Sequence, residues 1–304
     1  MRSQTACGTW TVLRSEVGGS KTGVGWLWIS ESMAGALRVG ISRSSLSWFC
    51  AMVATKPPAI SPHEQLEHDL LRRSQRRVHG APLRRTFLQG GTPRKPAPGP
   101  LAQFAHSGAH RAFDIYLLLI ALATGAPYNV GRDAGVWVRL LGLPQGENDA
   151  ATITKLWRWL ADHDLIERGR RGRQSAPTLL REDGSREAYL PPTGSGDPYF
   201  RIPFAFWLDD SQDQPPYLLL SLAAKTMLLI ALSRTGRTFP LKAVRVPDWY
   251  GISEDVAGKG LRELCNYNFL TVDKRQVRDL NSGTGWRTEP HYTRLWPPKN
   301  ARKA

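Results

Sequence analysis

Apolar and amphipathic stretches alternate along the C-terminal two-thirds of the chain. Residues 113–123 (FDIYLLLIALA) are almost continuously apolar and predict a buried helix. Residues 133–141 predict a second helix, and residues 147–163 a third whose apolar positions recur at helical spacing on one face. Residues 165–174 and 178–190 then predict the two strands of a hairpin. The first half of this region is therefore expected to contain three helices followed by a hairpin.

The same order of elements recurs further along the chain. After a predicted strand at 199–208, helices are expected at 218–234, 246–250 and 253–267, and a second hairpin at 270–278 and 290–296. A shift of 104 positions lays Lys155–Arg171 over Lys259–Arg275 and matches apolar positions with apolar positions. Since self-similarity at a fixed spacing indicates repeated structural units, we interpret the region as two tandem repeats.

Basic residues occupy equivalent positions in the two repeats. At about 100° per residue, the third helix of each repeat turns a Lys-x-x-Arg pair away from its apolar face. These pairs are Lys155 and Arg158 in the first repeat, and Lys259 and Arg262 in the second. The following hairpin is basic as well, with Arg168, Arg170, Arg171 and Arg173 in the first repeat, and Lys274 and Arg275 in the second.

The element order and the phrase Leu160-x4-Leu165-Ile166, with its copy Leu264-x4-Phe269-Leu270, resemble tandem winged helix-turn-helix proteins of bacteria. That group includes plasmid replication initiators and regulators of the MarR and GntR types. The resemblance covers about residues 105–298 and implies a protein that binds double-stranded DNA and is not an enzyme. It implies that the third helices enter the major groove while the basic hairpins contact the backbone.

The sequence thus predicts a mainly α fold with small β-wings. Four parts are expected: a poorly ordered segment at 1–60, a short helix with a basic Pro/Arg-rich linker at 61–104, and winged-helix units at 105–195 and 199–298. The linker expectation rests on a composition with few apolar groups. For the first segment, a second hypothesis is that translation begins at Met52.

Charge and cysteine content agree with this interpretation. The net charge of +15 favours a polyanionic partner. Three widely spaced cysteines offer no CxxC pair for zinc and are typical of a reducing cytoplasm. No apolar run predicts a membrane span or a signal peptide. We therefore expect a cytoplasmic, nucleoid-associated protein whose partner is double-stranded DNA, and the sequence leaves a homodimer open.

Other chemistry is weakly supported. Gly18–Thr22 lacks the spacing of a phosphate-binding loop, and His106 and His110 lack a third metal ligand, so no cofactor or metal is expected. The acidic run Asp209, Asp210 and Asp213 is interpreted as a solvated turn. Trp159 is expected in a groove between the repeats. Two alternatives stay open: a winged-helix module for protein contacts, and an RNA-binding protein.

Overall fold

The computed structural model describes residues 10–13, 27–30, 69–92, 94–208 and 214–297 of the 304-residue chain. The chain divides into two compact units, Met1–Ile60 and Ser61–Ala304. In the first, β1 (Trp10–Leu13) pairs antiparallel with β2 (Leu27–Ser30). Several expectations concern residues that the structure does not describe. These are the poor order of the rest of 1–60, the interpretation of Gly18–Thr22, the part of the short helix within 61–68, and the solvated turn at Asp209, Asp210 and Asp213.

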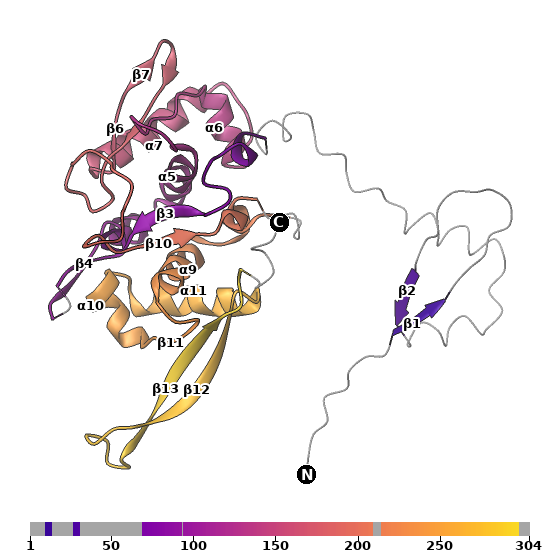
Figure 1. The fold of residues 1–304 in the computed structure, drawn as a ribbon, viewed down its shortest axis with the longest axis vertical. Coiled ribbons are helices and arrows are strands. Elements are labelled where there is room, and N and C mark those ends of the chain that lie inside the picture. The colour runs from indigo at the N-terminus through magenta and orange to yellow at the C-terminus, as the bar shows by residue number, and fades with distance from the viewer. Residues whose placement is uncertain (1–9, 14–26, 31–68, 93, 209–213, 298–304) are drawn as a thin grey trace. The chain divides into compact units, whose positions relative to one another are not determined.

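The first repeat has the predicted order of helices and strands (Figure 1). Its helices are α5 (His110–Leu122), α6 (Ala134–Leu140) and α7 (Asp149–Asp162). Two short antiparallel ladders follow, in which β6 (Ile166–Glu167) pairs with β9 (Thr178–Leu179) and β7 (Arg170–Arg171) pairs with β8 (Gln174–Ser175). The returning half of this hairpin is shorter than the predicted strand at 178–190.

The second repeat follows the same order with a longer hairpin. Its helices are α8 (Pro216–Leu219), α9 (Leu222–Ser233), α10 (Val246–Tyr250) and α11 (Glu254–Asn266). Its sheet has the order β11-β13-β12, built from β11 (Thr238–Pro240), β12 (Leu270–Arg278) and β13 (Trp286–Arg294). The predicted helix at 218–234 is split, because Leu220 is extended and the Ser221 side chain caps α9.

The two repeats share backbone detail at positions 104 residues apart. Asp164 and Asn268 both adopt left-handed backbone, with φ of 60° and 59°. The following amide closes the same turn in each copy: Leu165 donates to the Leu160 carbonyl at 3.1 Å, and Phe269 to the Leu264 carbonyl at 2.8 Å. Asp and Asn tolerate this conformation better than most residues. The chain segment after the first helix also pairs with the returning strand in both copies, through the Asn129–Thr178 bridge and through β11–β13.

Within the part predicted as a short helix and linker at 61–104, the prediction of a linker was wrong for residues 80–100. This segment forms β3 (Ala81–Arg84), a 3-10 turn at Arg85–Phe87, β4 (Gln89–Gly91) and β5 (Pro96–Pro98), and it leads into α4 (Leu101–Ser107). Its few apolar side chains, Leu83, Phe87 and Leu88, are fully buried. The composition of the whole segment is poor in apolar residues, so it did not indicate that these three are buried. The strand that pairs with β3 is also distant in the chain, β10 (Tyr199–Ile202). The strand predicted at 199–208 ends at Ile202 and continues as a 3-10 turn at Phe204–Phe206.

Buried apolar side chains from both repeats belong to one cluster, to which β3, α4 and β10 contribute. Within the second repeat α9 and α11 pack closely, since a Cβ on Gly260 would lie 2.3 Å from the Ala223 carbonyl oxygen. The described residues form a mixed α+β fold with small antiparallel sheets, which agrees with the expected combination of helices and small β-strands and is less helical than the mainly α fold predicted. None of the described helices has the length and apolar character needed to cross a bilayer.

Candidate nucleic-acid interface

The two faces of α7 separate apolar from basic side chains. Ile153, Trp157 and Leu160 are buried in the core. Lys155 and Arg158 are exposed, and neither forms an ion pair with another described residue. Both cations are therefore free to meet an external anion.

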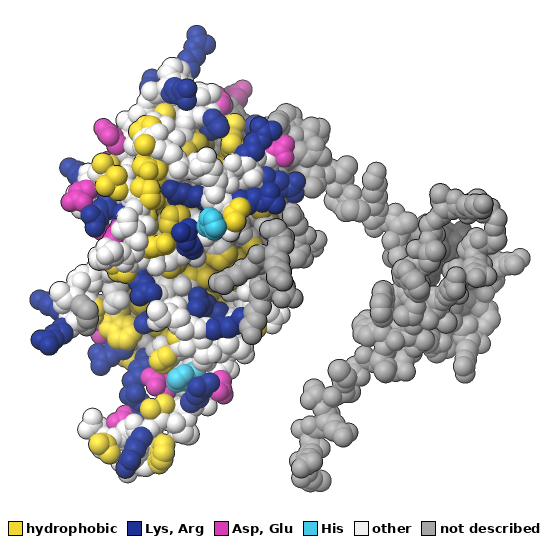
Figure 2. Space-filling model, viewed as in Figure 1, with side chains coloured by type: hydrophobic (Ala, Val, Ile, Leu, Met, Phe, Trp, Pro, Cys, Tyr) yellow, Lys and Arg dark blue, Asp and Glu magenta, His cyan; other side chains and the backbone are white. Residues whose placement is uncertain are grey.

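The first hairpin is the most basic exposed element of this repeat. Arg168, Arg170, Arg171 and Arg173 are all exposed, and none is in an ion pair with a described residue. Gly172 turns the chain at the end of the ladder with φ of 62°. Figure 2 shows Lys and Arg side chains at the end of the molecule that carries β7 in Figure 1. Four cations at such short spacing repel one another, so an anion bound beside them would stabilise the hairpin.

A hollow of about 460 Å³ lies between α7 and this hairpin. Its lining includes two residues with hydroxyl side chains, Thr154 and Ser175, and two arginines, Arg168 and Arg170. Trp157 also lines it, and the buried indole N–H of this residue has no hydrogen-bond partner among the described residues. Hydroxyl and guanidinium donors are the groups that proteins commonly direct at phosphate oxygens. The hollow can therefore seat an anionic group between the helix and the hairpin.

The second repeat carries a weaker version of the same surface. Lys259 and Arg262 are exposed on α11, but Lys259 pairs with Asp255 at 2.8 Å. On β12, Lys274 and Arg275 are exposed, and Arg275 pairs with Asp273 at 3.2 Å. Two of the four predicted cations thus already have an acidic neighbour.

Glu263, the acid beside Arg262, is engaged within the fold. Its carboxylate accepts a hydrogen bond from the backbone N–H of Ser221 at 2.7 Å and another from the hydroxyl of the same serine. This carboxylate therefore anchors α11 to the start of α9.

Trp159 lies against α4, with its ring centroid 4.6 Å from that of Phe104 and 3.8 Å from that of His163. Phe104 in turn stacks on Tyr116 of α5. Trp159 is thus a partly buried contact between α7 and the segment that the composition predicts as a linker.

His106 and His110 lie on different helices, α4 and α5. The Nε2 atom of His110 lies 2.7 Å from the Lys225 ammonium and 3.1 Å from an Asp114 oxygen. Lys225 is fully buried on α9, and burial lowers its pKa while the Asp114 carboxylate, 2.6 Å away, opposes that shift. This cluster joins the first helices of the two repeats. Among the described residues, no group of three His, Cys, Asp or Glu side chains is arranged to hold a metal ion.

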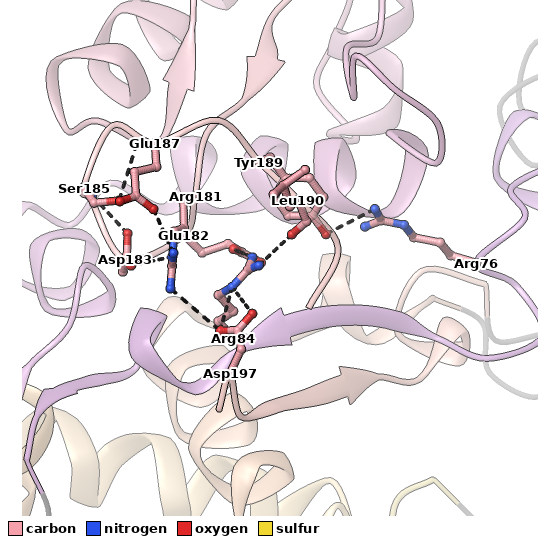
Figure 3. A network of polar contacts seen from close by, with 10 residues as sticks. All are labelled: Arg76, Arg84, Arg181, Glu182, Asp183, Ser185, Glu187, Tyr189, Leu190 and Asp197. Carbon is pink, nitrogen blue, oxygen red and sulfur yellow. Dashed lines mark hydrogen bonds and ion pairs between the residues drawn. The ribbon is translucent and has the colours of Figure 1, made fainter. Parts of the chain in front are cut away.

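A buried polar network that the sequence did not indicate holds the return path of the first hairpin (Figure 3). Arg84 on β3 pairs with Glu182, and its Nε lies 2.9 Å from both oxygens of Asp197. It also donates to the Leu190 carbonyl at 2.6 Å. Arg76 bonds the hydroxyl of Tyr189 in the same loop at 3.3 Å. Loop residues 181–197 are therefore fixed to β3.

Removing the charged groups of this network from water is unfavourable, and attraction between the opposite charges offsets that desolvation. Burial raises the pKa of Glu182, against the attraction of Arg84. Burial acts to lower the pKa of Arg84, but Glu182 and Asp197 together raise it. No sequence signal pointed to this pairing, because Arg84 stands in a basic run about a hundred residues before its partners.

Comparison with known proteins gives no match: no protein-family model, no curated protein and no solved structure corresponds to this chain.

Proposed function

We propose that the chain binds double-stranded DNA through two winged helices. The observation that carries the proposal is the repeated pairing of an outward basic helix face with a basic hairpin, joined in both copies by an equivalent left-handed turn at Asp164 and Asn268. The order of helices and hairpin in each copy supports this proposal, and so does the short segment after the first helix that pairs with the returning strand.

In this proposal α7 and α11 lie in the major groove, which is about 12 Å wide and admits one helix. Lys155, Arg158, Lys259 and Arg262 face the groove. Arg168, Arg170, Arg171 and Arg173 contact phosphates at its edge, with one phosphate in the hollow beside Trp157, and Lys274 and Arg275 do the same in the second repeat. Phosphate contacts supply most of the affinity, and groove contacts supply the sequence preference.

Binding of this kind serves either a regulator of transcription or an initiator of plasmid replication. Both roles require the same first step, so the proposal is stated at the level of DNA binding. The protein would then be associated with the nucleoid in the cytoplasm.

The test is a salt titration. Binding of a fluorescein-labelled mixed-sequence duplex of about 30 base pairs is measured by anisotropy at several KCl concentrations. The Arg170→Gln/Arg171→Gln/Arg173→Gln variant is expected to lower the slope of log affinity against log salt by about 2.7, or 0.9 for each lost phosphate contact. Arg77→Gln/Arg94→Gln/Arg111→Gln is the matched control, because these arginines are exposed and lie outside both hairpins.

Competition identifies the polyanion. Unlabelled duplex DNA is expected to displace the probe at lower concentration than duplex RNA of the same sequence, because the deep, narrow major groove of RNA does not admit a helix. If the slope of log affinity against log salt is the same for the wild type and the hairpin variant, the hairpin does not contact the DNA phosphates. Preference for RNA, or no binding of either duplex, would overturn the proposal.

A further inference from the structure

The second hairpin is far longer than contact with its own repeat requires. β12 and β13 have nine residues each and pair without interruption from Leu270–Arg294 to Arg278–Trp286. At about 3.4 Å per residue, the ladder spans roughly 30 Å. Near its base β13 pairs with β11, and Tyr292 stacks on Phe239. Beyond that base the hairpin projects away from the helices (Figure 1).

The tip of this hairpin is an ordered turn. The amide of Asp279 donates to the Gly285 carbonyl at 2.9 Å, and the amide of Gly285 donates to the Ser282 carbonyl at 2.8 Å. The hydroxyls of Ser282 and Thr284 both donate to the Trp286 carbonyl, at 2.9 and 3.0 Å. These bonds fix the direction in which the neighbouring side chains leave the backbone.

Two large apolar side chains are held in solvent at this tip. Leu280 is 85% exposed and Trp286 is 55% exposed. Figure 2 shows apolar and basic side chains together at the end of the hairpin. Arg278, directly opposite Trp286 in the ladder, is exposed and has no ion pair with a described residue. Trp286 thus lies across the ladder from a free cation.

We propose that Leu280 and Trp286 form an apolar wedge that enters the minor groove of duplex DNA and unstacks a base step. This inference rests on the proposed function. Proteins that kink DNA from the minor groove insert apolar side chains between base pairs and flank them with basic residues. The span of the hairpin, roughly 30 Å, is close to one helical turn of about 34 Å. With α11 in one groove, the tip therefore reaches the next groove along the duplex.

Size and charge favour DNA over a protein as the occupant of this tip. A stable protein interface needs about 800 Å² from each partner, whereas two side chains on a narrow turn offer far less. Across the hairpin Lys274, Arg275, Arg278, Arg287 and Arg294 outnumber Asp273, Asp279 and Glu289. A basic hairpin with exposed apolar side chains at its tip is complementary to a DNA groove, which has phosphates along its edges and stacked bases at its floor.

The experiment separates binding from deformation. The probe is a mixed-sequence duplex of about 30 base pairs with 2-aminopurine in its TpA steps, which are the easiest steps to unstack. Dyes at the two ends report bending by energy transfer. The wild type is expected to raise 2-aminopurine fluorescence and to shorten the end-to-end distance at saturation.

Leu280→Ser/Trp286→Ser is expected to lose most of both signals while affinity falls by less than about tenfold, because the phosphate contacts remain. Val78→Ser is the matched control, since Val78 is 83% exposed and lies outside both hairpins. Circular dichroism confirms that each variant folds. The wedge proposal is wrong if the wild type binds the duplex without raising 2-aminopurine fluorescence or shortening the end-to-end distance. It is also wrong if the tip variant keeps both signals. Neither result contradicts DNA binding. Failure of the wild type to bind the duplex would instead remove the proposed function itself.

Discussion

The two repeats share a backbone plan and differ in what lies on its surface. In the first, the exposed helix pair Lys155 and Arg158 and the four hairpin arginines are free of ion pairs with described residues. In the second, Lys259 and Arg275 already have acidic neighbours. The first hairpin is short and its return path is fixed by buried ion pairs, whereas the second is long and has an apolar base where Phe269 contacts Trp296, with ring centroids 5.3 Å apart.

This difference shows that fold and surface chemistry are specified by separate residues. The apolar positions and the left-handed turn at Asp164 and Asn268 set the common backbone in both copies. Surface charges do not contribute to that core, so they can differ between copies without a change of fold. In the proposed DNA complex, the first copy would supply most of the affinity and the second would extend its hairpin along the duplex.

The largest expected effect concerns the buried network that is present in the first repeat. Glu182→Ala leaves Arg84 buried with only Asp197 as a charged partner, and the free energy of unfolding should fall by about 3 kcal/mol. For a domain of this size, that loss lowers the melting temperature by roughly 6–12 °C. Thermal unfolding followed by circular dichroism measures it. Glu187→Ala is the control, because this carboxylate is 62% exposed and pairs with Arg181 at the surface. Equal losses in the two variants would contradict the role assigned to burial.

The second prediction compares the two helix faces directly. Lys155→Ala/Arg158→Ala should weaken duplex binding about 100-fold, which is about 2.7 kcal/mol for two groove contacts. Lys259→Ala/Arg262→Ala should weaken it about tenfold, because Lys259 is already paired with Asp255. Anisotropy at about 0.1 M KCl, where surface charges still act over roughly 10 Å, provides both values. A larger loss from the second pair would reverse the assignment of the stronger contact to the first repeat.

A third prediction tests the helix packing of the second repeat. Gly260→Ala places a methyl group 2.3 Å from the Ala223 carbonyl oxygen, so α9 and α11 must separate. The expected cost is about 2 kcal/mol, within the range for overpacked cores. Gly258 lies in the same helix, and a Cβ at this position would meet only the Arg262 side chain, at 3.8 Å. Gly258→Ala should therefore be neutral or stabilising, since alanine favours helix over glycine. Urea denaturation distinguishes the two variants, and similar midpoints would argue against close packing at Gly260.

The smallest expected effect lies at the starts of helices α7 and α11. The Ser253 side chain accepts a hydrogen bond from the Val256 amide and caps α11, so Ser253→Ala should cost about 1 kcal/mol. Asn148 precedes α7 without a side-chain cap bond, and Asn148→Ala should change stability little. Melting temperatures of the two variants provide the comparison. If Asn148→Ala lowers the melting temperature more than Ser253→Ala does, the assignment of a side-chain cap to α11 and not to α7 is wrong.

Local pattern was sufficient for many of the elements. The bounds predicted for residues 246–250 and 270–278 agree with α10 and β12 to the residue. The 104-residue repeat was visible because equivalent core positions need apolar side chains in both copies. The exposure of all ten predicted basic residues also followed from helical and strand periodicity, since charged groups are rarely buried without a partner.

The sequence by itself determined the order of helices and hairpins after residue 105 and the outward basic faces, because these depend on the spacing of side chains along one element. Only the tertiary structure decided that β3 pairs with β10, that Arg84 is buried among distant carboxylates, and which cations are already paired. These features join residues far apart in the chain. Their energies depend on three-dimensional proximity and burial, which the spacing of residues within one element does not encode.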